Sequence, residues 1–113
     1  MSKNITLKIA NTLATLTFDF VNEKVNKLSA QVMEELEETL KTIRKDKSIK
    51  LLLIKSNKEK IFIAGADINE IQKIKTKNEA LKKLKYGQEI LHQIASLKVP
   101  TIALINGACL GGG

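Results

Sequence analysis

The chain has 113 residues, of which 43% are hydrophobic and 27% are charged, and its net charge is +7. This length fits one small domain or part of a larger one, and the composition is ordinary for a globular protein with a buried core. No apolar run approaches the roughly 20 residues of a membrane-spanning helix, so the sequence predicts no membrane span.

The first predicted elements are a β-hairpin and a helix. Residues 5–10 and 13–20 alternate apolar and polar side chains, a pattern typical of half-buried strands, and Asn11-Thr12 is a plausible tight turn between them. After a loop, Ser29 is a good N-cap for a helix that ends near residues 46–48. The apolar residues at helical spacing are Val32, Met33, Leu36, Leu40 and Ile43.

Further strands and helices alternate along the rest of the chain. The apolar run within residues 49–54 predicts a strand buried on both faces, as in a parallel or spiral sheet. Residues 61–63 are again apolar and lead to Asp67, which can cap a short helix with Glu70 closing a capping box. A second box at residues 76–79 opens a long helix. The side chains expected to face inward from it are Leu81, Leu84, Leu91, Ile94 and Leu97.

Pro100 blocks this helix, and residues 101–105 predict another buried strand before a glycine-rich turn. The order β-β-α-β-α-α-β indicates an α/β fold, either layered or spiral. The sequence contains no internal repeat and no interdomain linker.

Two segments share one design. Ala64-Gly65-Ala66-Asp67 and Leu110-Gly111-Gly112-Gly113 each place small residues after a strand, at or just before a helix start. Small residues let a ligand approach the backbone closely, and N–H groups at a helix start favour negative charge. Two such groups converging on one oxygen would form an oxyanion hole, while two ordinary tight turns are the alternative.

Residues 61–70 and 99–113 resemble, in order and separation, the two signature motifs of the crotonase (enoyl-CoA hydratase/isomerase) superfamily. The loop Val25-Asn26-Lys27-Leu28-Ser29 resembles the one that touches coenzyme A in this family. The amino-acid sequence of residues 62–69 is most similar to that of the family branch found in α subunits of multifunctional fatty-acid oxidation complexes. The resemblance implies that residues 1–113 are the N-terminal part of a crotonase-like ββα spiral, an incomplete domain truncated at the second oxyanion-hole motif.

The resemblance also implies a function, namely hydration of trans-2-enoyl-CoA in fatty-acid β-oxidation, with Δ3-Δ2 isomerisation as an optional second activity. The two oxyanion-hole donors fall on the backbone N–H groups of Ala66 and Gly112. No separate cofactor is implied, since coenzyme A is part of the substrate, and no metal, because no ligand cluster exists. The other substrate-binding positions are Lys27, Leu28, Ala64, Asp67, Ile68 and Asn69.

Acid–base residues are missing from this picture. Hydratases of the family use two catalytic glutamates, of which the first corresponds to position 115 and the second lies further on. The sequence contains neither, so we expect low or no hydratase activity from residues 1–113. Asp67 and Glu70 are better explained as helix caps, the lone His92 as structural or exposed, and Cys109 as a buried packing residue. None of them makes a convincing acid–base pair.

Several alternatives stay open. One is another crotonase enzyme, such as an isomerase, a hydrolase or a dihydroxynaphthoyl-CoA synthase-like protein; another is a non-catalytic remnant or an RNA-binding hydratase-like module. RNA binding would use the lysine cluster, which is otherwise a solvated face, but Tyr86 is the only aromatic residue there to stack on bases. The lysine cluster consists of Lys73, Lys75, Lys77, Lys82, Lys83 and Lys85.

Partners and location follow from the same observations. For a full-length protein, the resemblance implies a homo-oligomer or a complex with a thiolase subunit. Residues 1–4 include no hydrophobic stretch of a secretory signal, and a single cysteine cannot form an internal disulfide. Both points favour the cytoplasm, where thiols stay reduced.

Overall fold

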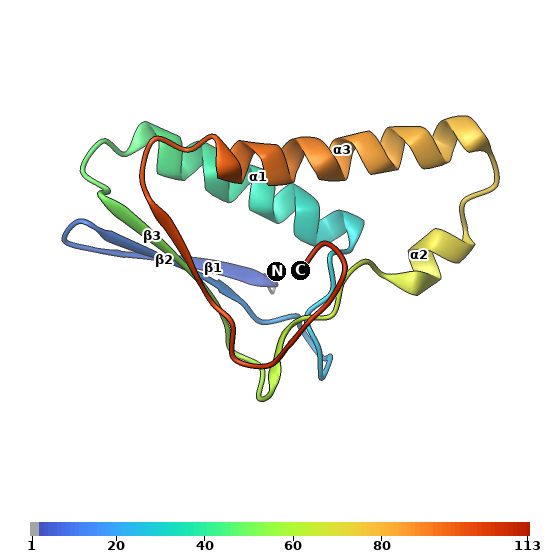
Figure 1. Cartoon of the computed structure of the whole chain (residues 1–113), viewed down its shortest axis with the longest axis horizontal. Helices are drawn as coiled ribbons and strands as arrows, with labels where there is room; N and C mark the ends of the chain where they lie inside the picture. Colours follow the sequence, from blue (N-terminus) through green and yellow to red (C-terminus); the bar gives the residue numbers. More distant parts are fainter. Residues whose placement is uncertain (1–2) are drawn as a thin grey trace.

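A computed structural model describes residues 3–113, so Met1 and Ser2, where the sequence predicts no signal segment, lie outside the described residues. The predicted hairpin, helices and strands are present, with two short strands in addition (Figure 1). The elements are β1 (Ile5–Ala10), β2 (Leu13–Phe18), α1 (Ala30–Lys45), β3 (Leu51–Ser56), β4 (Ile61–Ile63), α2 (Ile68–Gln72), α3 (Lys77–Ala95), β5 (Thr101–Leu104) and β6 (Ala108–Cys109).

The strands form two sheets. The larger has the order β1-β2-β3-β5, in which β1 and β2 are antiparallel and the β2–β3 and β3–β5 pairs are parallel. The smaller sheet consists of the parallel pair β4 and β6. Figure 1 shows α1 and α3 together on one side of the larger sheet, with α2 standing apart from it. The second sheet is therefore what brings the two glycine-containing segments to one place.

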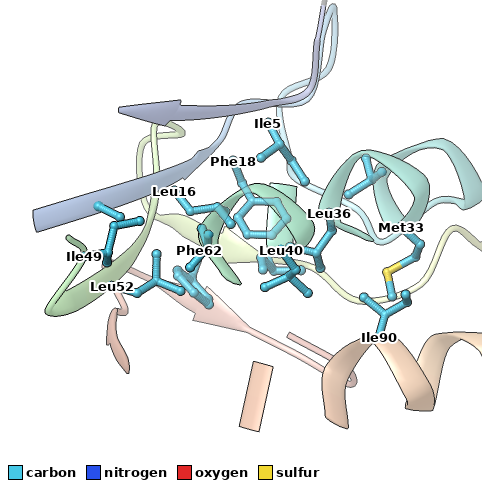
Figure 2. Packing of buried hydrophobic residues seen from close by; sticks show 14 residues of the cluster. Ile5, Leu16, Phe18, Met33, Leu36, Leu40, Ile49, Leu52, Phe62 and Ile90 are labelled. Carbon is cyan, nitrogen blue, oxygen red and sulfur yellow. The ribbon is translucent and has the colours of Figure 1, made fainter. Parts of the chain in front are cut away.

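The core lies between the larger sheet and α1. The predicted inward stripe of α1 is confirmed, since all five of its apolar residues are buried, and Leu36 and Leu40 are among the largest fully buried side chains. Leu16 of β2 and Leu52 of β3 meet this stripe from the sheet. Figure 2 shows the same cluster, in which Met33 of α1 lies beside Ile90 of α3.

The predicted helix caps are largely confirmed. The Ser29 hydroxyl accepts a hydrogen bond from Val32 N–H, and the Thr76 hydroxyl accepts one from Glu79 N–H. Asp67 caps α2 by accepting from Asn69 N–H. These short polar contacts fix where each helix begins and, for α2, where the segment containing Ala66 ends.

Three burial expectations are wrong. Leu81, Leu84 and Leu91 of α3 are 41%, 59% and 36% exposed. Ile90 is instead the buried residue of this helix. All four residues of β5 are exposed, because β5 is the last strand of its sheet and, among the described residues, no element covers it. Cys109 is also exposed, since β6 is only two residues long and pairs on one side with β4. In each case the apolar pattern predicts a covering layer that residues 3–113 do not supply.

No helix among the described residues combines the length and apolarity needed to cross a membrane.

Candidate functional site

The two glycine-containing turns leave the small sheet side by side. β4 and β6 pair in parallel, and Leu110 N–H donates to the Ile63 carbonyl at 3.0 Å just beyond the paired residues. Gly65 and Gly111 both have positive φ, +102° and +53°, a conformation that residues with a β-carbon rarely adopt. The two turns are in contact, since a β-carbon on Gly65 would lie 3.2 Å from the Leu110 carbonyl oxygen.

Each glycine immediately precedes one of the two predicted donors. Neither Ala66 N–H nor Gly112 N–H donates a hydrogen bond within residues 3–113, and both residues are exposed. The Gly65 carbonyl is held by Leu28 N–H at 2.8 Å. Because the peptide unit is planar and trans, the N–H of Ala66 points opposite to that carbonyl, away from the Leu28 backbone.

Leu28 connects the two donors. Its backbone forms a parallel bridge with Ala66, and its side chain packs against Gly112, where an added β-carbon would lie 2.9 Å from Leu28 Cδ1. Any side chain at position 112 would therefore displace Leu28. Glycine at this position therefore lets the second turn lie directly against the Leu28 side chain.

A cavity of about 650 Å³ opens next to both donors. Ala66 and Gly112 contribute to its wall together with residues from α1, α2 and α3. The wall is mostly apolar, and the exposed leucines of α3 belong to it, which explains why they do not join the core. Its apolar residues include Leu28, Met33, Ile71, Ile74, Leu81, Leu84 and Leu91.

Charged and polar side chains also belong to the wall of this cavity. Lys77 and Lys83 are part of its wall, and Lys83 pairs with Glu79 at 3.7 Å. Tyr86 donates to the Glu37 carboxylate at 2.7 Å and so ties α3 to α1. Burial and this hydrogen bond raise the pKa of Tyr86 to about 12, so its hydroxyl stays protonated at neutral pH.

The first turn of α1 is linked to α2 by Glu70. The Glu70 carboxylate accepts from Ala30 N–H, with distances of 2.9 and 3.2 Å to its two oxygens. The predicted capping box is therefore wrong in its second half, because Glu70 reaches the neighbouring helix rather than its own N-terminus. An anion at a helix N-terminus is favoured by the helix dipole and by unpaired N–H groups.

Only some of the predicted substrate-binding residues line the cavity. Ala66, Gly112, Leu28 and Asp67 all contribute to the cavity wall. The remaining positions do not: Ala64 donates to the Asn26 carbonyl, Ile68 and Asn69 are exposed, and Lys27 forms an ion pair with Glu23 at 3.8 Å. The roles of all these residues stay predictions.

The arrangement offers electrostatic rather than acid–base chemistry. Two free N–H groups beside an apolar cavity can hold an oxygen on which negative charge develops. Asp67 and Glu70 are engaged with backbone N–H groups, and His92 is exposed on α3. Among residues 3–113, no three His, Cys, Asp or Glu side chains lie together as metal ligands would.

Two contributors were not expected from the sequence. Asn26 is buried beside the first turn, and the exposed face of α3 forms the far wall of the cavity. Asn26 lies in the loop of residues 25–29 that resembles the coenzyme A loop of the family, but nothing in a single sequence predicts its burial. The α3 face had the signature of a core stripe, and nothing in its pattern separates a core from a cavity wall.

Comparison with known proteins gives a consistent result. The family model described as "Enoyl-CoA hydratase/isomerase" matches residues 8–113. The fatty acid oxidation complex subunit alpha of Shewanella loihica is 40% identical over the whole chain, which spans 16% of that protein. Enoyl-CoA hydratase from Bacillus anthracis superposes with a TM-score of 0.88 at 27% identity, with 98% of this chain covering 43% of that one.

A hydratase from Shewanella pealeana, at 23% identity, shares the fold with a TM-score of 0.89, covering 97% of this chain and 42% of its own. The expected α/β fold, the N-terminal part of a crotonase-like spiral, is thereby confirmed. The similarity to fatty-acid oxidation α subunits that the first motif predicts is confirmed as well. The chain spans less than half of the length of each of these relatives.

Proposed function

Because the chain belongs to the enoyl-CoA hydratase/isomerase (crotonase) family, we propose that it binds acyl-CoA thioesters of fatty-acid β-oxidation and polarises their carbonyl group with the N–H groups of Ala66 and Gly112. One observation carries the proposal: two N–H groups without acceptors among residues 3–113, each following a glycine of positive φ, border a single apolar cavity. An oxyanion hole requires two free donors at one cavity that can point to a single oxygen.

The mechanism follows from where charge develops. The thioester oxygen accepts from both N–H groups, and the bonds strengthen as the oxygen becomes an enolate. Each such donor typically contributes a few kcal/mol to a transition state. The apolar side chains of the wall take the acyl chain, and its lysines attract the phosphates of coenzyme A.

The complete reaction needs more than this site. Hydration requires a base for water and an acid for the α-carbon, and Asp67, Glu70 and His92 are not placed to serve. We therefore assign to residues 1–113 substrate binding and carbonyl polarisation, and hydration to a longer protein that supplies a glutamate pair. No cofactor besides the coenzyme A of the substrate is needed. The Shewanella loihica relative is named as a subunit of a fatty acid oxidation complex, and for a longer form of this chain we propose a thiolase subunit as the partner.

The test separates the carbonyl from the rest of the ligand. Hexanoyl-CoA and its thioether analogue hexyl-CoA differ only at one carbon, which is a carbonyl in the first and a CH2 group in the second, and both can be titrated by calorimetry. We expect the thioester to bind about tenfold more tightly, equivalent to about 1.4 kcal/mol of hydrogen bonding.

Ala66→Pro removes one donor without breaking a bond within the described residues, and it should abolish this preference while thioether affinity is kept. Circular dichroism serves to verify that the variant folds. Equal affinity of the unchanged chain for both ligands contradicts the proposal.

A further inference from the structure

Asn26 is a buried polar side chain beside the Ala66 turn, only 1% exposed. Its amide nitrogen donates to the Phe62 carbonyl and to the Ser56 hydroxyl, both at 2.8 Å, and its amide oxygen accepts from Phe20 N–H at 2.9 Å. Both amide N–H donors and one of the two acceptor positions of the amide oxygen are thus used. Only one orientation of the amide group allows these three hydrogen bonds.

The Asn26 loop runs along the segment that ends in the donor. Asn26 contacts the Phe62 carbonyl through its side chain and Ala64 N–H through its own carbonyl, both at 2.8 Å. Two residues further on, Leu28 N–H holds the Gly65 carbonyl, also at 2.8 Å. These contacts form a short ladder that ends at the peptide bond between Gly65 and Ala66.

That peptide bond carries the donor itself. Its carbonyl is the group that Leu28 holds, and its N–H is the predicted oxyanion donor, on the opposite edge of one rigid plane. Gly65 is free to rotate because it has no side chain, so the plane keeps its direction only if the Leu28 loop is fixed. Asn26 fixes this loop to β3 through Ser56, which in turn donates to the Ile61 carbonyl at 2.7 Å.

We infer that Asn26 is a positioning residue: it anchors the 26–28 loop and thereby sets the direction in which Ala66 N–H points. It does not touch the ligand, since it is not part of the cavity wall. The inference rests on the proposed function for its meaning, but its structural content concerns the Ala66 peptide alone.

The test uses a ligand whose absorption spectrum depends on hydrogen bonding to its thioester oxygen. The absorption of 4-dimethylaminocinnamoyl-CoA moves to longer wavelength when hydrogen bonds draw electrons onto its thioester oxygen. The full chain, saturated with this compound, should show the shift. Asn26→Ala and the near-isosteric Asn26→Asp, which loses both donated bonds, should lose at least half of it at saturation. Ser56→Ala removes one partner of Asn26 and should lose less.

Asn4→Ala is the matched control. Asn4 is also a buried asparagine, 5% exposed, whose side chain bonds to Glu35 and to Val21 N–H, away from the cavity. The Asn4→Ala variant should destabilise the fold to a similar degree and leave the spectral shift intact. If Asn26 had a purely structural role, the Asn26 and Asn4 variants would affect the shift equally. An unchanged shift in both Asn26 variants overturns the inference.

A second readout separates this inference from the proposed function. If the unchanged chain shows no shift, the oxyanion hole is refuted, and the amide resonances of Ala66 and Leu28 then decide about Asn26. We expect both resonances to move in the Asn26 variants and to stay in place in Asn4→Ala. Resonances that stay in place in the Asn26 variants overturn the positioning role without reference to any ligand.

Discussion

Removal of the Glu70 carboxylate should loosen α2 from the rest of the molecule. α2 has no buried residue, so the bond from Ala30 N–H to Glu70, 2.9 Å at its shorter, is a main link between this helix and α1. A hydrogen bond of this kind contributes about 1 kcal/mol net, and the favourable position of an anion at the N-terminus of α1 adds about 0.5 kcal/mol. Glu70→Ala should therefore cost about 1.5 kcal/mol, and Glu70→Gln about half, since it keeps an acceptor without the charge.

The consequence for binding follows from the cavity. Glu70 and Ile71 belong to its wall, so a detached α2 removes one side of the proposed acyl site. A change of about 1.4 kcal/mol in the closed state corresponds to a tenfold change in its population, and affinity for octanoyl-CoA should fall by up to that factor. Affinity for the short acetyl-CoA should fall less, because its acyl group offers less apolar surface to α2 than an octanoyl group does.

Urea unfolding and calorimetric titration measure the two effects. Glu89→Ala is the matched control, because Glu89 is an exposed carboxylate on α3 with no hydrogen-bond partner among the described residues. This control should lie within about 0.5 kcal/mol of the unchanged chain. If Glu70→Ala behaves like Glu89→Ala in both assays, the link through Ala30 N–H does not hold α2.

Four further outcomes are expected. Gly107→Ala should destabilise the chain by about 3 kcal/mol or abolish folding, because the added methyl group would overlap the Lys60 carbonyl; urea unfolding measures this. Tyr86 has a raised pKa in the folded state, so its contribution to stability is complete below pH 10 and is lost as the pH rises towards 12; Tyr86→Phe should flatten this part of the stability profile. Purified residues 1–113 should hydrate crotonyl-CoA slowly or not at all, and turnover comparable with a full-length hydratase would show that acid–base residues are present after all. In a gel-shift assay at physiological salt, the lysine cluster should give no sequence-specific RNA complex, and a complex lost on neutralising these lysines would revive that alternative.

Local signals in the sequence predicted the elements well. Ser29, Asp67 and Thr76 act within three residues of their own position, so their capping roles can be read without knowing the fold. The hairpin and its turn at Asn11, where φ is +56°, are local in the same sense. The second strand ends at Phe18 rather than residue 20, a difference that reflects only how far pairing with β1 continues.

Predictions that depend on distant partners were less successful. β4 and β6 are three and two residues long, and such strands exist only because each pairs with the other. Leu84 and Cys109 were expected to be buried because apolar residues usually are, but their exposure is set by which layers surround them. Glu70 satisfied the spacing of a capping box, yet the N-terminus of α1 lies within its reach and offers an unpaired N–H.

In the site, too, local features could be predicted from the sequence and contacts between distant segments could not. The motif pair identified Ala66 and Gly112, and the structure places both at one cavity. The contact between their glycines could not be read from either motif, because it depends on the parallel pairing of β4 with β6. The burial and hydrogen bonds of Asn26 could not be predicted for the same reason, since its partners come from three different strands or strand ends.

The two proposed donors lie on segments far apart in the sequence, and this affects the order in which the molecule folds. Contacts between residues far apart in sequence form slowly, because a long loop must close before they contribute any stability. Leu28, Gly65 and Leu110 meet only when three separate segments have arrived, whereas the hairpin and α1 depend on nearer neighbours. We therefore expect ligand binding to appear last during refolding, after helical signal has returned. In native-state hydrogen exchange, the amides around Gly111 should open at lower free energy than those of α1, so that this corner of the molecule reports whether folding is complete.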